Sequence, residues 1–160
     1  MATANTQPPS AVRLTQYAAL DIKGADAEKF LQGQTSAQVG LANGTFAPLT
    51  CFCTPKGRML ANGQLLRLGS DHFRLVLDAS LADGLLTHLK KFAAFYKAEL
   101  SVVGSVTFAG ASEPADTLAN QLDITLPDQP YTHTTSSKGT ALRMPGKPRW
   151  LLMFEENASD

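Results

Sequence analysis

Features that mark several large functional classes are scarce in this sequence of 160 residues. Neither sign of charge is in excess, because 14 lysines and arginines balance 14 aspartates and glutamates. That balance argues against strong non-specific binding to nucleic acid. The opening MATANTQPPS has neither a basic start nor an apolar core, so it predicts no signal peptide, no membrane span and no membrane partner. We interpret residues 1–11 as a disordered lead-in.

Cysteine is rare, since only Cys51 and Cys53 occur. Their spacing in an apolar strand puts both side chains on one face and disfavours a disulfide between them. No second pair of cysteines is available to complete a zinc site. We therefore expect both thiols to be reduced and mostly buried, in a cytoplasmic protein.

Motifs for catalysis, nucleotide binding and metal binding are also missing. The chain has no phosphate-binding loop of the Walker type, no Gly-rich dinucleotide motif and no Ser-His-Asp order. The histidines His72, His88 and His133 do not have the spacing of metal ligands. We expect no metal site.

What the chain does have is 44 % hydrophobic residues, enough for a sizeable core. Strands and helices mix without a regular βαβ alternation, which predicts an α+β fold of mixed or antiparallel sheets with packed helices. Helices are expected after Asp26, from Ser80 onward and over residues 112–122. Strands are expected over residues 17–22, 45–54, 58–68, 72–78, 100–103, 106–108, 132–135, 140–143 and 150–154.

The helix beginning at Ser80 is the clearest. Ser80 and Asp83 have the spacing of a capping box. An apolar stripe follows at helical spacing, formed by Leu81, Leu85, Leu89, Phe92 and Tyr96. The strand before it alternates, with Phe73, Leu75 and Leu77 on one face and His72, Arg74 and Asp78 on the other. We expect the helix to pack on the apolar face of that strand.

Two short segments are candidate binding sites. In FLQGQTS, Gln32 and Gln34 flank a glycine where a helix ends, which indicates either a C-cap with exposed amides or two hydrogen-bonding groups for a planar polar ligand. In TPKGR, Lys56 and Arg58 belong to a turn. They either keep a hairpin tip soluble or bind a carboxylate or phosphate.

Three blocks, KGADAEKFLQGQTSAQV, CTPKGRML and LKKFAAFYKAEL, resemble in order and spacing the first half of the YgfZ family. That family is related to the folate-binding aminomethyltransferase, or T-protein, of the glycine cleavage system. The resemblance extends from about residue 12 to about residue 154. It implies part of a ring of α+β domains around a hole that holds tetrahydrofolate. On this basis we expect a first domain over residues 12–103 and a partial second one over residues 104–160.

The resemblance also implies a function. Members support the assembly or repair of iron–sulfur proteins, and in bacteria this links them to tRNA thiomethylation. Folate and iron–sulfur proteins or their assembly machinery are therefore the expected partners. The family's signature block, Lys-Gly-Cys-aromatic-x-Gly-Gln-Glu, does not occur here. We expect either a truncated or a naturally short form, which lacks the ligand contacts of a third domain.

Two positions bear on catalysis. The aminomethyltransferases follow the turn with a pair of aspartates, and the matching positions here are Ala61 and Asn62. Neither can take a proton as a carboxylate does, which disfavours aminomethyl transfer.

Asp78 matches a folate-contacting asparagine, so it is either a ligand for the pterin or an ordinary strand-end residue before a helix.

The function expected from the sequence is that of a folate-binding accessory protein without catalysis of its own. The alternative is a folate-dependent aminomethyl or one-carbon transferase that uses other residues. An RNA-contacting module has the support only of Lys56, Arg58, Lys90 and Lys91, and zero net charge counts against it. The candidate folate-binding residues are Gln32, Gln34, Lys56, Arg58 and Asp78.

Overall fold

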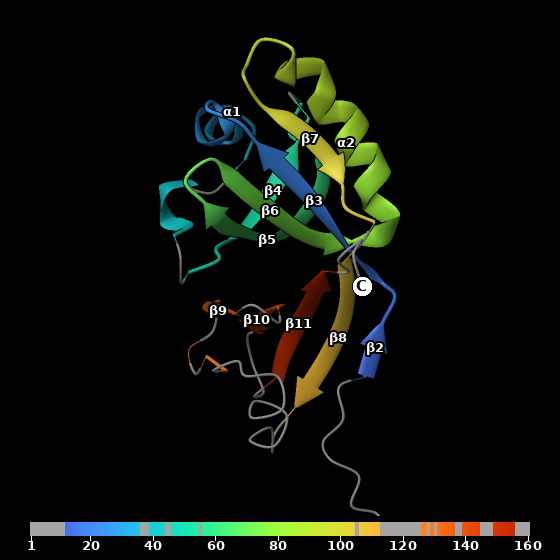
Figure 1. The fold of residues 1–160 in the computed structure, drawn as a ribbon. Coiled ribbons are helices and arrows are strands. Elements are labelled where there is room, and N and C mark those ends of the chain that lie inside the picture. The colour runs from blue at the N-terminus through green and yellow to red at the C-terminus, as the bar shows by residue number, and fades with distance from the viewer. Residues whose placement is uncertain are drawn as a thin grey trace, which may run out of the picture. The chain divides into compact units, whose positions relative to one another are not determined.

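The computed structural model describes residues 12–35, 39–43, 46–54, 56–104, 106–112, 126–127, 129, 131–136, 139–144 and 149–155. The chain divides into two compact units. One comprises residues 15–104, and the other comprises residues 1–14 together with residues 105–160. Each unit is built around one five-stranded sheet, and within the described residues every strand pair is antiparallel (Figure 1). The α+β class is thus correct.

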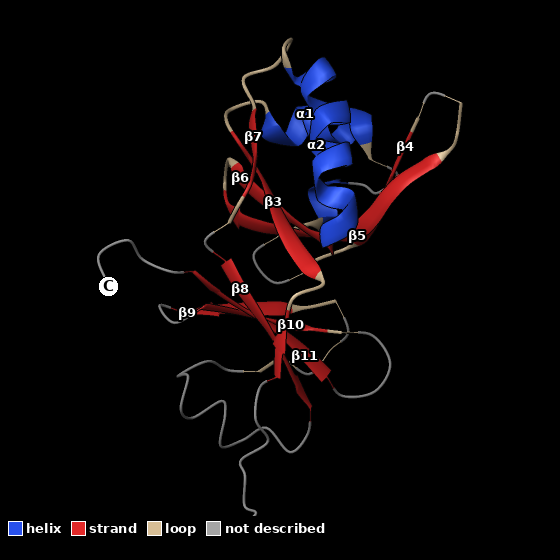
Figure 2. Cartoon of the chain, turned by 90° about the vertical axis from the view of Figure 1, so that its right-hand side faces the viewer, coloured by secondary structure: helices blue, strands red, loops and turns tan. Residues whose placement is uncertain are grey.

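The unit of residues 15–104 has the strand order β4-β5-β6-β3-β7. Its helices lie on one side of this sheet (Figure 2). Every strand and helix expected within this unit is present; the strand over residues 72–78 has the expected bounds, and the ends of the other strands are shifted. In chain order the elements are β3 (Tyr17–Lys23), α1 (Ala27–Gln34), the short 3-10 helix η1 (Val39–Leu41), β4 (Leu49–Cys53), β5 (Met59–Gly69), β6 (His72–Asp78), α2 (Ala79–Ala93) and β7 (Glu99–Val102).

The core of this unit lies between the sheet and its helices, as the periodicity predicts. Leu85 and Leu89 of α2 are buried in one cluster with the strand residues Phe73, Leu75 and Leu77. Helix α1 adds Phe30, whose ring lies 5.3 Å from that of Tyr96. No helix in the described part of the chain is long and apolar enough to cross a membrane.

The capping box expected at the start of α2 was wrong. Helix α2 begins at Ala79, and its N-cap is Asp78, which accepts a hydrogen bond from the amide of Ser80, so Ser80 and Asp83 do not form a capping box. With this start the buried stripe consists of Ala82, Leu85, Leu89 and Ala93, and Leu81 stays 38 % exposed. Asp26 precedes α1 but makes no side-chain cap bond to it. Its carboxylate accepts a hydrogen bond from the Lys97 amide instead, at 2.9 Å.

The cysteines are less buried than expected. Burial alternates along β4, and Phe52 takes the core side, with 1 % of its surface exposed. Cys51 and Cys53 therefore share the opposite side, where Cys51 is half-buried and Cys53 is exposed. Both thiols are free of disulfides. The spacing argument was correct about the shared face and wrong about which face it is.

The other unit has the strand order β2-β8-β11-β10-β9. Residues 12–14, which we expected in the first domain, form β2 and pair with β8 of this sheet. Trp150 is buried, and its indole nitrogen donates to the Pro127 carbonyl at 2.8 Å. The lead-in of residues 1–11 and nearly all of the helix expected over residues 112–122 lie outside the described residues. The strands are β2 (Val12–Leu14), β8 (Val106–Ser112), β9 (His133–Ser136), β10 (Gly139–Arg143) and β11 (Arg149–Glu155).

Candidate functional site

The basic turn between β4 and β5 is closed by its own backbone. The Thr54 amide donates to the Arg58 carbonyl and the Gly57 amide donates to the Thr54 carbonyl, both at 2.8 Å. Gly57 has a φ of 87°, a conformation that glycine adopts without steric cost. Lys56 and Arg58 are exposed, and neither side chain has a hydrogen bond or ion pair within the part of the chain that the structure describes. The turn thus presents two cations to solvent.

The FLQGQ segment ends close to the strand that leads into this turn. Gln32 accepts a hydrogen bond from the Val39 amide through Oε1 at 2.8 Å, so one part of its amide ties α1 to η1. Gln34 is half-buried at the end of α1. The next residue, Thr35, forms a β-bridge with Phe52 of β4. The end of α1 and the strand before the basic turn are therefore neighbours.

Asp78 has a structural role. Its Oδ1 accepts hydrogen bonds from the Ser80 hydroxyl at 2.6 Å and from the Ser80 amide at 2.9 Å. These two bonds, that of the hydroxyl first, hold the pKa of the exposed carboxyl below its usual value, against a small opposing effect of burial. No hydrogen bond to Oδ2 is found among the described residues. One carboxylate oxygen is therefore available at the strand end.

The positions matched to the aminomethyltransferase aspartates lie beside Asp78. In the antiparallel register between β5 and β6, Gly63 pairs with Leu77. Asn62, one residue before Gly63, and Asp78, one residue after Leu77, therefore lie side by side at the same end of the sheet. Both are exposed. Ala61 is 1 % exposed and belongs to the apolar core. Of the two matched positions, only Asn62 offers a polar group to solvent.

These elements converge at one end of the sheet. Phe52 pairs with Ala61 and bridges to Thr35, which places the end of α1, the start of β5 and the basic turn together. Asp78 lies at the same end of β6. Gln32 lies further back on α1 and faces η1. The convergence joins Gln34, Lys56, Arg58 and Asp78 with Asn62, while Gln32 is partly engaged elsewhere.

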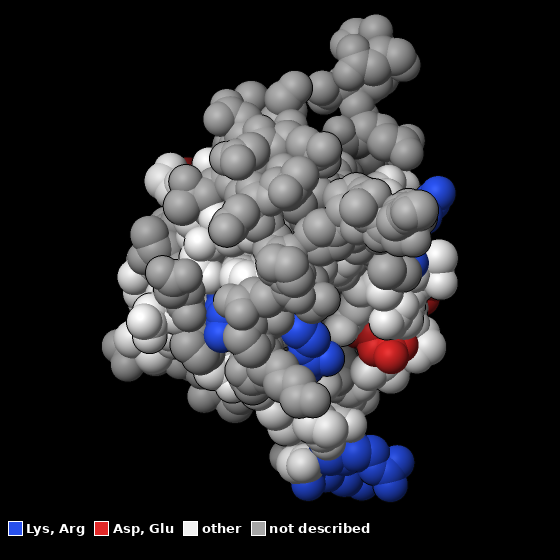
Figure 3. All heavy atoms as spheres, turned by 90° about the horizontal axis from the view of Figure 1, so that it is seen from below, with Lys and Arg blue, Asp and Glu red and all other residues white. Residues whose placement is uncertain are grey.

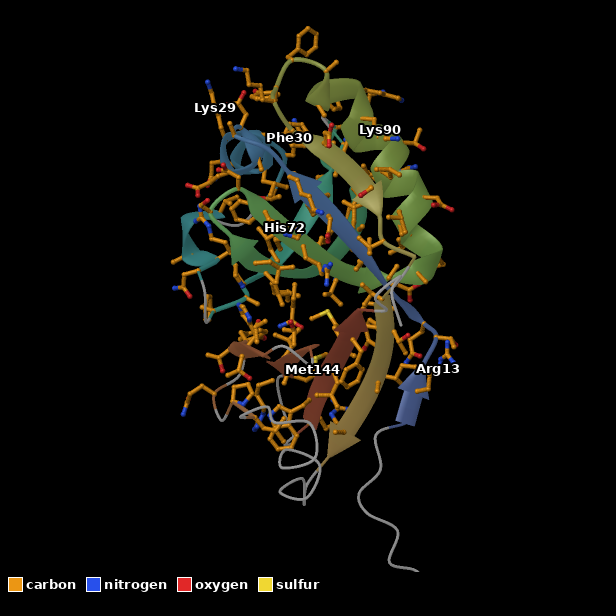
Figure 4. The ribbon with its side chains drawn as sticks, in the orientation of Figure 1. Arg13, Lys29, Phe30, His72, Lys90 and Met144 are labelled. Atoms are coloured by element: carbon orange, nitrogen blue, oxygen red, sulfur yellow. The ribbon has the colours of Figure 1, made fainter. Side chains whose placement is uncertain are left out.

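A buried charge cluster on the same sheet was not expected from the sequence. Asp21 on β3 lies opposite Arg74 on β6 and receives two hydrogen bonds from it, Nε to Oδ1 at 2.7 Å and Nη2 to Oδ2 at 3.0 Å. Nε2 of His72, labelled in Figure 4, lies 2.8 Å from the same Oδ2. Both members of the ion pair have only 3 % of their side chains exposed.

The predicted alternation along β6 is correct, but by itself it does not show that Arg74 is buried. Alternation puts Arg74 opposite Phe73 and Leu75, yet the residue is buried. The signal available was Asp21, a lone carboxylate in the apolar strand YAALDIK. A buried carboxylate needs a partner, but the partner is 53 residues away, and its identity depends on strand register.

In the view of Figure 3, the lysines and arginines of the described residues occur in separate groups. This distribution is in keeping with the net charge of zero.

Comparison with known proteins identifies related sequences. No protein-family model matches the chain. A tRNA-modifying protein YgfZ from Enterobacter sp. strain 638 is 41 % identical over 90 residues, which are 56 % of this chain and 27 % of that protein. A tRNA-modifying protein YgfZ from Cronobacter sakazakii is 31 % identical over 137 residues, which are 84 % of this chain and 41 % of that protein. The chain thus spans less than half the length of these curated relatives.

Among solved structures, the glycine cleavage system aminomethyltransferase T from Bartonella henselae matches with a TM-score of 0.78 at 14 % identity. The match covers 91 % of this chain and 41 % of that one. Such a low identity speaks for the fold alone. The resemblance expected from the three sequence blocks is confirmed: the chain is YgfZ-like in sequence and has a fold related to that of the glycine cleavage aminomethyltransferase.

Proposed function

We propose that this chain is part of a cytoplasmic folate-binding accessory protein that supports the assembly or repair of iron–sulfur proteins and, through them, tRNA modification. Support for the last step comes from relatives named tRNA-modifying proteins. Support for folate comes from the aminomethyltransferase-like fold. In this proposal the chain forms the first part of a ring of domains around tetrahydrofolate.

The observation that supports the proposal is that the strand register brings the positions of several polar residues to one end of the sheet. Oδ2 of Asp78 can accept hydrogen bonds from the amino and ring N–H groups of a pterin. The amides of Gln34 and Gln32 suit the edge of a planar polar ring. Lys56 and Arg58 are cations at the tip, where the carboxylates of a glutamate tail would reach them.

The same end of the sheet favours binding over group transfer. A general base must present a group of suitable pKa within hydrogen-bond reach of the proton it takes. Asn62 is an amide and cannot act in that way, and Ala61 is directed into the core. Folate would therefore serve here as a bound ligand of an accessory protein and not as the acceptor of an aminomethyl group.

The test uses a chimera in which this chain is continued by the C-terminal region of the Cronobacter YgfZ. Binding of polyglutamylated tetrahydrofolate is measured for the chimera and for the 160-residue chain alone. We expect the chimera to bind and the chain alone to bind poorly, because the proposed site needs groups from further domains. In a bacterial strain that lacks YgfZ, the chimera should restore thiomethylated tRNA.

Two results would contradict the proposed function, and a third would contradict the placement of its site. A chimera that restores tRNA thiomethylation without binding folate would remove folate from the function. If the unchanged chimera had a trace of aminomethyltransferase activity and its Asn62→Asp variant had clearly more, the alternative function of a transferase would be favoured. Tight folate binding by the short chain would mean that the site does not need further domains.

A further inference from the structure

Three sulfur atoms come from one small area of the β4-β5 hairpin. Cys51 and Cys53 share the face of β4 that points away from the core. Met59, the first residue of β5, pairs directly with Cys53 across the strands. Met59 is 56 % exposed, Cys53 is exposed and Cys51 is half-buried.

We propose that Cys51, Cys53 and Met59 bind a soft, thiophilic metal ion, namely Cu(I). Thiolate and thioether sulfur are the ligands that select Cu(I) over harder cations. This inference does not depend on the proposed folate function, although the three residues lie on the hairpin that also carries Lys56, Arg58 and Asn62, and Cys51 pairs with Asn62.

The backbone spacing allows all three sulfur atoms to reach one ion. Residues two apart on a strand have Cα atoms about 6.6 Å apart, and directly paired residues across antiparallel strands about 4.5–5.5 Å apart. Two sulfur atoms on one metal, each about 2.3 Å from it, lie up to about 4.6 Å apart. Because the side chains are on the same face, they can bring their sulfur atoms to this sulfur–sulfur distance from the larger Cα spacing without moving the backbone.

The register irregularity at this point helps to expose the thioether. Phe52 pairs with Ala61, yet the next pair is Cys53 with Met59, so Leu60 is an extra residue on β5. Such a bulge bends its strand and re-aims the side chains beside it. Met59 is thereby set opposite Cys53 at the base of the basic turn.

Charge also suits an anionic metal complex. Two thiols that bind Cu(I) release two protons to solvent, and the copper keeps its oxidation state, so the complex of one Cu(I) with two thiolates has one negative charge. Lys56 and Arg58 lie in the turn between the two strands, and their side chains have no ion-pair partner among the described residues. Nearby cations stabilise such an anion.

The test is a competition experiment on the reduced 160-residue chain without oxygen. Cu(I) is offered together with a chromogenic Cu(I) chelator, and the copper retained by the protein is measured. We expect one Cu(I) per chain, bound more tightly than by glutathione at the same thiol concentration. Affinity should rise with pH, since binding releases protons.

Variants decide whether these residues form the site. Cys51→Ser and Cys53→Ser should each weaken binding by at least about 100-fold, and Met59→Leu by about 10-fold, because each removes one ligand of the ion. Met144→Leu is the matched control, because Met144 is a half-buried methionine of the other unit (Figure 4), and it should bind like the parent. Circular dichroism verifies that each variant is folded.

Three outcomes would overturn the inference. The first is copper held no more tightly than by glutathione. The second is one copper shared by two chains, which would indicate bridging between exposed thiols. The third is a folded Cys53→Ser variant that binds like the parent. Sulfur-only coordination in the X-ray absorption spectrum of the copper-loaded parent, changed by Met59→Leu, would support the three-ligand site.

Discussion

The two faces of the sheet in residues 15–104 are held by different physical interactions. The face under α1 and α2 is apolar, and Leu20, Ile22 and Leu75 on it are fully buried. The opposite face carries Asp21, Arg74 and His72 in one cluster and exposes Asn62 and Asp78 at one end. The first face is stabilised by burial of hydrocarbon, whereas the second combines buried apolar side chains, Ala19, Leu66 and Val76, with directed polar contacts.

The difference shows where tolerance to change should lie. Hydrophobic burial is non-directional, so the apolar face can adjust to some substitutions by repacking. A buried ion pair fails when one partner is lost, because the remaining charge stays out of water without compensation. A single change inside the polar face should therefore lower the free energy of unfolding more than a single change on the apolar face. A change at the exposed end of the polar face should lower it less.

The largest effect is expected from Asp21→Ala. This change leaves Arg74 buried and without its carboxylate, which costs about 3–5 kcal/mol of unfolding free energy. Urea denaturation measures the loss. Asp71→Ala is the matched control, because Asp71 is exposed, and it should change stability by no more than about 0.5 kcal/mol.

The double variant Asp21→Ala with Arg74→Leu sharpens this prediction. Since it removes both charges, it should be clearly more stable than Asp21→Ala alone. If the double variant were as unstable as the single one, the cluster would stabilise the fold through packing and not through charge.

On the apolar face, Leu89→Ala should cost about 2–5 kcal/mol. Leu89 is fully buried in the cluster that joins α2 to the sheet, so the change removes its transfer energy and leaves a cavity. Leu81→Ala on the same helix, at a site that is 38 % exposed, provides the comparison and should cost much less. Equal losses at the two sites would contradict the assignment of the buried face.

The apolar face could be predicted from the sequence because its signals are local. The spacing of Leu85 and Leu89 and the alternation of Phe73, Leu75 and Leu77 specify which sides meet, whatever the register of distant strands. The ends of elements were less predictable. Asp78 competes with Ser80 for the role of N-cap, and the choice depends on where β6 stops.

The polar face could not be predicted because its partners are far apart in the sequence. Asp21 meets Arg74 only when β3 and β6 pair in the observed register, and nothing near either residue specifies that register. At the candidate site, the neighbourhood of Thr35 and Phe52 is equally non-local. The exposure of Cys53 was misjudged because alternation gives two faces but does not say which one faces the core.

At the exposed end of the polar face, Asp78 should give α2 a stability that depends on pH. Its hydrogen bonds with Ser80 lower the pKa of the folded state below the unfolded value of about 3.9. The contribution is therefore fully present above the unfolded pKa and is lost as the pH falls through the folded pKa. Asp78→Asn can still accept a hydrogen bond but does not titrate. The stability difference between parent and variant, measured from neutral to acid pH, should shrink on acidification, and a constant difference would contradict the assignment.

The smallest effect on stability is expected at the tip of the hairpin. Lys56→Ala with Arg58→Ala removes two exposed cations and should change the unfolding free energy by no more than about 0.5 kcal/mol, because the turn is closed by backbone hydrogen bonds. In the chimera described above, the same double change should weaken binding of polyglutamylated tetrahydrofolate and reduce the restored tRNA thiomethylation. Lys90→Ala with Lys91→Ala, on the last turn of α2, makes the same change of charge and should leave folate binding unaltered. If the two double variants bind folate alike, Lys56 and Arg58 only keep a hairpin tip soluble and do not contribute to folate binding.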